Sequence, residues 1–181
     1  GPGINYVDKG PSEINIQHAI LDGGCPYWGS GYASLNITDS HITNAKNWYI
    51  WYPQEDCHIK RNILTKSEGI SIGAKGDIGV YIINNIFHNC TSDYAIENWA
   101  SYESSKTIVK FNSFLTNDKI ALLLPPGYNN TAMSEVAYNF WNTTDPAAIN
   151  SMIYDKNDDL SCADYINYGP ILPEPHPDTP R

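Results

Sequence analysis

The sequence predicts an all-β protein that folds as a parallel β-helix of about six rungs, with a short capping helix and strand near its C-terminus. Three observations predict this fold class. A local pattern centred on asparagine recurs along the chain, two columns of apolar residues accompany it, and a second strand-like segment follows each copy. One coil of chain per copy, with neighbouring coils ~4.8 Å apart in the strand-pairing direction, accounts for all three.

The repeat is clearest in the segment VYIINNIFHN (residues 80–89), where Asn85 is placed at position 0. The same position is taken in turn by His18 (or Gln17, if the register slips by one residue), Ser40, Asn62, Asn112 and Asn139. The resulting period of 22 to 27 residues is too short for a helix-pair repeat, and it lacks the leucine spacing of a leucine-rich repeat. We therefore expect each copy to contain short strands joined by corners.

Two apolar columns accompany the reference position. Two residues after it, the side chains are large and apolar: Ile20, Ile42, Leu64, Phe87, Phe114 and Trp141. Three residues before it, they are β-branched in five copies, and Asn15 breaks the column in the first: Ile37, Ile59, Ile82, Val109 and Val136. Equivalent positions of a parallel coil lie above one another, so both columns are expected to stack inside the molecule.

Asparagine at an inward-turning corner needs partners, because a buried amide without hydrogen bonds costs ~1–3 kcal/mol. In stacked coils, each amide can donate to and accept from the amide of the neighbouring rung. The sequence therefore predicts a ladder through Asn62, Asn85, Asn112 and Asn139. The adjacent column, with no ladder of its own, is expected only to decorate the corner: Asp39, Arg61, Asn84, Phe111 and Tyr138.

The second strand-like segments, such as NWYIWY, EGISIG, DYAIEN and DKIALLL, complete the rungs over residues 14–142. Residues 143–169 form the predicted cap, with Asp145 as the helix N-cap and Pro146 in its first turn. Residues 170–181 are a proline-rich tail, which we expect to leave the domain as a stiff extended segment. Residues 1–13 are a lead-in that starts with a tag scar at 1–2, and further rungs or domains are expected upstream.

Composition and charge exclude several classes of function. A formal net charge of −9 argues against nucleic acid and anionic membranes as partners. No apolar stretch reaches the ~18 residues that a membrane-inserted helix needs. The four cysteines show no zinc spacing and are too sparse for a disulfide framework, so we interpret them as free or partly buried thiols. The sequence also lacks a phosphate loop, a dinucleotide fingerprint and a G-x-S-x-G motif.

With its asparagine ladder and apolar columns over residues 14–142, the chain resembles the right-handed parallel β-helix repeat family, which includes pectate-lyase-like enzymes and many bacterial and archaeal surface proteins. Within that family, it looks most similar to the archaeal disaggregatase-associated type. The run NFWNTTDPAAINSMIYDKNDDLSCADYINYGPILPEP resembles the C-terminal cap of such proteins. The resemblance implies an extracellular or cell-surface protein whose partner is a polysaccharide.

Chemistry on the first strand of each rung is expected at positions −4 and −2, which alternate with the inward column and point outward. These positions place His58, Lys60, Tyr81 and Lys110 in one basic and phenolic strip. For an acidic sugar, a lysine neutralises the uronate while a histidine, tyrosine or lysine takes the proton next to it, which is the logic of a lyase. Ordinary solvated side chains on a strand are the alternative.

A second candidate pair is Glu68 and Glu97, which the sequence places on roughly equivalent second strands of successive rungs. Two carboxylates a few ångström apart can serve as a glycosidase pair or supply half of a Ca²⁺ site. Unrelated surface acids are the alternative. No other metal site is predicted.

Aromatic residues gather in the predicted corner loops, where rings beside asparagine and glycine are typical sugar-stacking platforms. The candidate binding residues of this kind are Trp28, Trp48, Trp51, Trp99 and Tyr102. The leading hypothesis is therefore an extracellular polysaccharide-cleaving enzyme, lyase or glycoside hydrolase, or a fragment of one. The alternative is a non-catalytic carbohydrate-binding or adhesive module. Ice binding is disfavoured, because no Thr-x-Thr ladder is present.

Overall fold

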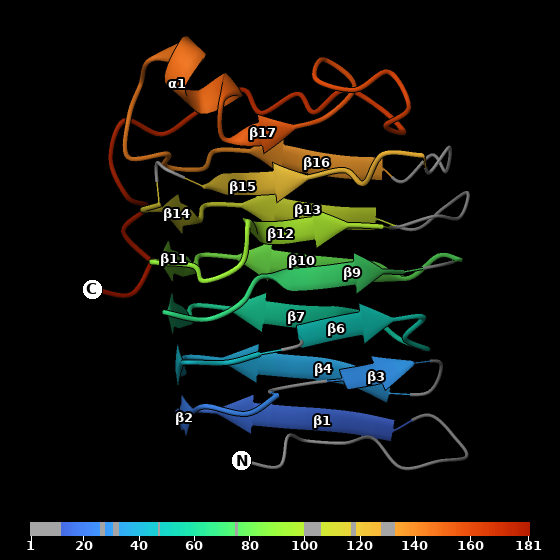
Figure 1. Cartoon of the computed structure of the whole chain (residues 1–181). Helices are drawn as coiled ribbons and strands as arrows, with labels where there is room; N and C mark the ends of the chain where they lie inside the picture. Colours follow the sequence, from blue (N-terminus) through green and yellow to red (C-terminus); the bar gives the residue numbers. More distant parts are fainter. Residues whose placement is uncertain are drawn as a thin grey trace.

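The computed structural model describes residues 12–25, 28–30, 33–46, 48–74, 76–99, 106–116, 119–127 and 133–181. Over these residues, the chain forms a parallel β-solenoid of about four turns with three parallel sheets, followed by a short C-terminal helix and strand (Figure 1). The predicted all-β parallel architecture is confirmed. Figure 1 shows the coils stacked from β1 at one end to β17 and α1 at the other.

Each sheet collects one strand from successive coils. Sheet I contains β1 (Ser12–Gln17), β4 (Ala33–Thr38), β7 (Cys57–Lys60), β10 (Gly79–Ile83), β13 (Lys106–Lys110) and β16 (Met133–Ala137). Sheet II contains β2 (Ile20–Asp22), β5 (His41–Thr43), β8 (Ile63–Thr65), β11 (Ile86–His88) and β14 (Ser113–Phe114). Sheet III contains β3 (Trp28–Ser30), β6 (Trp48–Trp51), β9 (Ile70–Gly73), β12 (Tyr94–Asn98), β15 (Ile120–Leu123) and β17 (Ile153–Tyr154).

The two predicted apolar columns are buried inside the solenoid. In the column three residues before the reference position, Ile37, Ile59 and Ile82 pair with one another across β4, β7 and β10 and are fully buried. In the column two residues after it, Phe87 stacks on Phe114, and Phe114 stacks on Trp141. The core is therefore a set of continuous stacks along the solenoid axis.

The first coil is in a different register from the one predicted. Ala19, rather than His18 or Gln17, occupies the reference position, and its backbone N–H donates to Ser40 Oγ at 3.0 Å. As a result, Leu21 lies opposite Ile42 and Ile16 lies opposite Ile37, whereas Ile20 points outward with 84% of its surface exposed. The first interval is 21 residues rather than 22, and Asn15 does not interrupt the apolar column.

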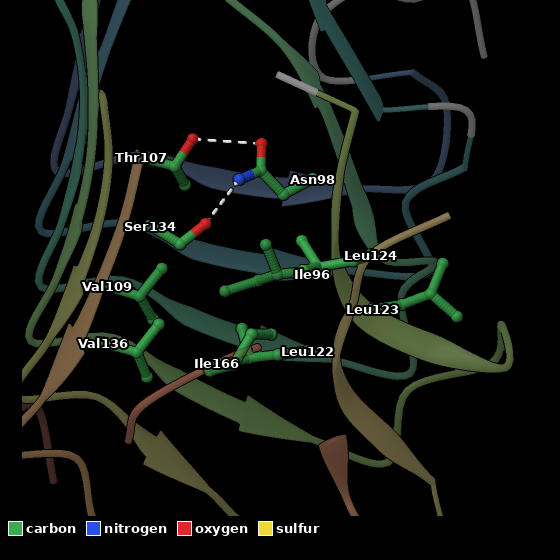
Figure 2. Close-up of a pocket in the computed structure, with 10 residues that line it drawn as sticks. All are labelled: Ile96, Asn98, Thr107, Val109, Leu122, Leu123, Leu124, Ser134, Val136 and Ile166. Atoms are coloured by element: carbon green, nitrogen blue, oxygen red, sulfur yellow. Dashed lines mark hydrogen bonds between the residues drawn. The ribbon is translucent and has the colours of Figure 1, made fainter. Parts of the chain in front are cut away.

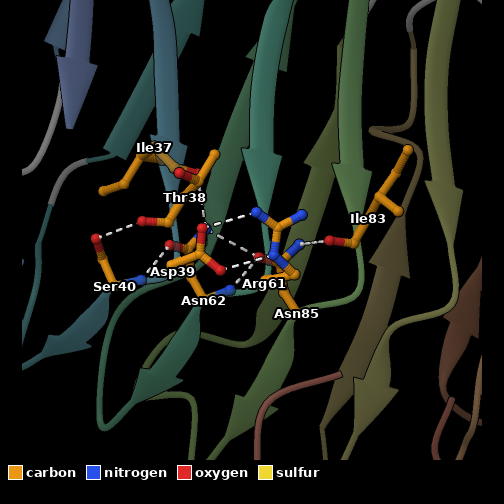
Figure 3. A network of polar contacts seen from close by, with 8 residues as sticks. All are labelled: Ile37, Thr38, Asp39, Ser40, Arg61, Asn62, Ile83 and Asn85. Atoms are coloured by element: carbon orange, nitrogen blue, oxygen red, sulfur yellow. Dashed lines mark hydrogen bonds and ion pairs between the residues drawn. The ribbon is translucent and has the colours of Figure 1, made fainter. Parts of the chain in front are cut away.

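The predicted asparagine ladder is present, and it is saturated with hydrogen bonds. Asn62, Asn85, Asn112 and Asn139 are fully buried. Asn85 Oδ1 accepts from both the backbone N–H and Nδ2 of Asn62, each at 3.0 Å (Figure 3). Asn85 Nδ2 donates onward to Asn112 Oδ1 at 3.0 Å and back to Ile59 O at 2.8 Å. Asn62, Asn85 and Asn112 thus each hold three consecutive coils together, and Asn139 ends the ladder by joining two.

The neighbouring column has a structural role that the sequence did not reveal. Each of its members adopts a left-handed backbone with φ between 52 and 60°: His18, Asp39, Arg61, Asn84, Phe111 and Tyr138. Asn84 suits this position because asparagine tolerates left-handed backbone. Arg61 makes a double hydrogen bond to Asp39 at 2.6 and 2.7 Å (Figure 3), and Phe111 stacks on Tyr138. The column forms the sharp corner between sheets I and II.

Polar side chains also meet inside the solenoid near its C-terminal end. Asn98 accepts from Thr107 Oγ1 at 3.1 Å and donates to Ser134 Oγ at 2.8 Å (Figure 2). These three residues come from sheets III and I, and apolar side chains surround them. Their hydrogen bonds satisfy the buried polar atoms and tie the two sheets together across the core.

The helix α1 (Pro146–Asn150) begins as predicted, with Asp145 accepting from the backbone N–H of Ala147. The proline-rich tail does not leave the domain. It runs back along the left-handed corner, where Leu172 N–H donates to Asn139 O and Thr179 Oγ1 donates to Phe111 O, both at 3.0 Å. In Figure 1 the tail descends beside sheet II from the cap towards the level of β11. The corner column supplies a ready surface for it.

Candidate functional site

The strip predicted on the first strands comes together on the outer face of sheet I. His58 and Lys60 alternate with buried Cys57 and Ile59, so both point outward. Tyr81 lies opposite His58 on the next strand. Its ring stacks on the imidazole, with centroids 4.8 Å apart and planes inclined by 25°.

Two lysines flank this ring pair. Lys60 Nζ lies 5.8 Å from the centre of the Tyr81 ring, within the range of a cation–π contact. Lys110 lies opposite Ile83, one strand further along the sheet, and makes an ion pair with Glu135 at 2.7 Å. The four predicted residues of the strip therefore share one face of β7, β10 and β13.

Asp56 and Gly79 also belong to the strip, and the sequence prediction did not include them. Asp56 Oδ1 accepts from the backbone N–H of Gly79 at 2.7 Å. A Cβ at Gly79 would lie 2.6 Å from Cε2 of Tyr81, so the absence of a side chain lets the phenol ring lie over the strand. Asp56 also interacts with the Tyr81 hydroxyl. Asp56 stands at position −6, two residues before His58, so the period-2 rule could have identified it.

The environment of the strip shifts the pKa values of both of its titratable rings, His58 and Tyr81, in directions that suit proton transfer near pH 7. Burial lowers the pKa of His58, and the positive charge of Lys60 lowers it further. Burial and the negative charge of Asp56 raise the pKa of the Tyr81 phenol. Near pH 7 the imidazole is therefore neutral and can accept a proton, while the phenol is neutral and can donate one.

The two ring nitrogens of His58 are not equivalent. Nδ1 is buried and has no hydrogen-bond partner among the described residues, and the same is true of Oδ1 of Asn36, which lies opposite on β4. The Asn36 amide nitrogen donates to Glu13 at 2.8 Å and to Asn15 at 3.1 Å. Because Nδ1 is covered, Nε2 is the nitrogen that is available for proton transfer.

The predicted pairing of Glu68 with Glu97 is wrong. Glu97 lies opposite Ser71 in the preceding rung, and Glu68 is three residues earlier in the chain than Ser71. The sequence prediction failed because the segment between the paired strand positions of sheets II and III is longer in the rung of Glu97 (residues 89–95) than in the rung of Glu68 (residues 66–69). Among the described residues, no group of three or more His, Cys, Asp or Glu side chains is arranged to hold a metal ion, so the Ca²⁺ hypothesis gains no support from this pair.

The predicted aromatic residues separate into three groups. Trp48 was predicted to be a surface platform, and this prediction is wrong: its side chain is 99% buried and points into the core, opposite Ile70. Trp51 and Trp99 do meet on the outer face of sheet III, with ring centroids 6.0 Å apart. Trp28 belongs to β3, where its backbone lies opposite Tyr49. Tyr102 lies outside the described residues.

A polar group beside these rings was also missing from the prediction. Ser71 Oγ donates to Glu97 Oε2 at 2.7 Å, and the Tyr94 hydroxyl lies 3.0 Å from Ser71 Oγ. Burial raises the pKa of Tyr94 to about 12. Ser71 lies within β9 and Tyr94 begins β12, and neither residue type signals a polar network at such a position, so the network is visible only in three dimensions.

Comparisons with known proteins found no match for this chain among family models, curated proteins or solved structures. In the part of the chain that the structure describes, no helix has the length and apolarity needed to span a membrane. The geometry of the two outer faces is therefore the basis for the functional proposals that follow.

Proposed function

We propose that this protein binds an acidic polysaccharide along the outer face of sheet I and cleaves it by elimination. The observation that supports this proposal best is the stacked pair of His58 and Tyr81 beside Lys60. A neutral imidazole, a neutral phenol and an ammonium group share one open strand face. The positive charge of Lys60 attracts a negatively charged uronate to this face, although the protein as a whole is acidic.

The roles follow from the protonation states. Lys60 neutralises the carboxylate of a uronate unit, which makes the neighbouring C–H more acidic. Lys110, which is paired with Glu135, adds positive charge beside the same unit. His58 Nε2 takes that proton, and the electron pair forms the new carbon–carbon double bond as the bond from carbon to the glycosidic oxygen breaks. Tyr81 gives its proton to the departing oxygen. Asp56 holds the Gly79 backbone under the Tyr81 ring and thereby positions the acid.

Elimination fits the geometry better than hydrolysis. A glycosidase needs two carboxyl groups on opposite sides of one bond, about 5–10 Å apart. Glu97 lies on sheet III and faces Ser71, whereas the acids of the strip, Asp56 and Glu135, are engaged by Gly79 and Lys110. With this function we also propose a right-handed solenoid of six rungs that is located at the cell surface. Such a protein would be similar to pectate-lyase-like and archaeal disaggregatase-associated proteins. The six-stranded order of sheets I and III favours six rungs.

The test is to incubate the protein with polygalacturonate and other uronate-containing glycans while following two signals. Elimination produces ultraviolet absorbance from the new double bond together with new reducing ends. We expect both signals from the wild type, and about a hundredfold less from His58→Ala and Tyr81→Phe. Lys156→Ala, a lysine of the C-terminal region, is the matched control and should retain full activity. New reducing ends without an increase in absorbance would contradict elimination and indicate hydrolysis.

A non-catalytic carbohydrate-binding or adhesive module is the second candidate. It is favoured by the openness of the strip, where the side chains of Lys110 and Glu135 are 29% and 47% exposed. In that case, polygalacturonate would retard the protein in affinity electrophoresis without any absorbance change. Lys60→Ala and Lys110→Ala would then weaken the retardation, whereas Lys156→Ala would not.

A further inference from the structure

The outer face of sheet III has a chemistry opposite to that of sheet I. One outward column contains Tyr49, Ser71 and Glu97. The next contains Trp51 and Gly73, and Trp99 continues it directly after β12, where its backbone N–H donates to Ile72 O at 2.7 Å. Trp51 and Tyr49 are half-buried, while the residues between and beside them, Trp48 and Ile50, are buried in the core. This face therefore combines aromatic rings with a carboxylate and has no lysine or arginine in these two columns.

Gly73 explains how the two tryptophans can meet. Trp51 ends β6 and Trp99 directly follows β12, the two neighbours of β9, so their backbones lie roughly 9–10 Å apart, twice the strand spacing. A Cβ at Gly73 would lie only 2.4 Å from Cε3 of Trp51, so the indole lies directly over this glycine. Lying flat over β9, the indole of Trp51 reaches within 6.0 Å of the Trp99 ring, at an interplanar angle of 45°.

The carboxylate next to the rings is held in place. Glu97 lies in β12 and Trp99 directly follows the last residue of that strand, with its backbone N–H still donating to Ile72 O at 2.7 Å, so the two side chains leave the same face. Ser71 is 99% buried and donates to Glu97 Oε2 at 2.7 Å. Because the Ser71 hydrogen points to the carboxylate, the Tyr94 hydroxyl donates to Ser71 at 3.0 Å. Ser71 and Tyr94 together orient Glu97, and a carboxylate has about four lone-pair sites, so it can still accept from a ligand.

The geometry points to a subsite for a neutral sugar unit on this face. A pyranose has an apolar C–H face that stacks on indole rings and hydroxyl groups that donate to a carboxylate. The Glu97 charge disfavours a uronate, so this subsite selects against the acidic glycan that sheet I attracts. The inference rests on sheet III alone and does not depend on the elimination chemistry. Taken together with the function proposed for sheet I, it gives the solenoid two glycan-binding faces with opposite charge preferences.

The experiment is affinity electrophoresis of the whole chain in gels that contain a galactomannan, a xyloglucan, a mixed-linkage β-glucan or polygalacturonate. At least one of the three neutral polymers should retard the wild type. Trp51→Ala and Trp99→Ala should each raise the dissociation constant about tenfold or more. Glu97→Gln should raise it by a smaller factor, and Trp99→Tyr, which keeps a ring, should retain most of the affinity.

Two controls separate this site from sheet I and from misfolding. Tyr165→Ala removes an aromatic residue that is 56% exposed in the C-terminal region, and it should leave retardation by the neutral polymer unchanged. His58→Ala should likewise leave it unchanged, whatever it does to polygalacturonate. Thermal unfolding of each variant identifies any that is not folded. The inference is overturned if none of the neutral polymers retards the wild type, or if retardation survives both tryptophan truncations.

Discussion

At the scale of single residues, the fold depends on amide side chains that hold backbone together between coils. The ladder asparagines carry no exposed surface, and Asn62, Asn85 and Asn112 make side-chain hydrogen bonds to the coils on both sides. Their identity could be predicted from the sequence because only a stacked geometry satisfies a recurring amide in an apolar run. The left-handed corner beside them could not be predicted, since it is occupied by residue types as different as Arg61 and Phe111.

Replacing Asn85 by leucine tests the ladder. The change removes the acceptor of the buried Asn62 backbone N–H and the side-chain donor to Ile59 O, at ~1–3 kcal/mol for each unsatisfied group. We expect the free energy of unfolding, measured with denaturant, to fall by several kcal/mol. Asn157→Leu, at an exposed site in the C-terminal loop, is the control. An unchanged melting temperature in Asn85→Leu would refute the role assigned to the ladder.

Lys66 tests the second corner of the coil. It is exposed and has a left-handed backbone with φ of 52°. Glycine adopts this conformation without strain, whereas a β-branched residue is penalised by roughly 1–2 kcal/mol. Lys66→Gly should therefore match or slightly exceed the wild type in thermal stability, and Lys66→Val should melt at a lower temperature. Equal melting temperatures for these two variants would contradict the corner geometry.

At the scale of elements, strand-to-strand register decides which predictions succeed. The strip on sheet I was predictable because His58, Lys60, Tyr81 and Lys110 sit on strands whose register the asparagine anchors fix. The pairing of Glu68 with Glu97 was not, because the loops between sheets II and III vary in length. Trp48 and Trp51 show the same limit: one faces the core and the other faces solvent, and alternation decides between them only when the strand start is known.

The strip makes stability depend on His58 and pH. The pKa of His58 is lowered in the folded state. At a pH below the ordinary histidine value of about 6.5, the unfolded chain therefore binds more protons than the folded chain does. Folding stability that involves His58 is therefore complete above that value and declines as the pH falls towards the folded-state pKa. Between pH 7.5 and pH 5, the wild type should lose more unfolding free energy than His58→Gln. An equal loss would show that burial of the imidazole has no such effect.

The C-terminal tail behaves as an integral element. His176 Nδ1 and Asn84 Nδ2 are 3.0 Å apart, and the His176 ring lies 4.6 Å from that of Phe111. Deleting residues 173–181 should lower the unfolding free energy by about 1–3 kcal/mol, because these contacts and the Thr179 bond are lost. It should also increase amide hydrogen exchange at residues 84 and 111. A truncated chain with unchanged exchange there would show that the tail is dispensable.

At the scale of the whole molecule, the stacked coils present two long outer faces with different charge and ring content. Sheet I offers lysine, histidine and a phenol, whereas sheet III offers two indoles and a carboxylate. Because parallel coils repeat in register, each face aligns its side chains along the solenoid axis, a direction that suits an extended polymer. The repeat in the sequence predicts that such faces exist. The difference in charge and aromatic content between them is seen only in the fold.

The most direct test of the central claim is to map amide chemical-shift changes while an oligogalacturonate is titrated into the isotopically labelled protein. If sheet I binds acidic glycans, the changes will concentrate at residues 57–60, 80–83 and 106–110 and will shrink as salt screens the lysines. Residues 49–51 and 97–99 on sheet III should remain unchanged. Shifts that concentrate on sheet III, or that spread evenly over the surface, would contradict the account.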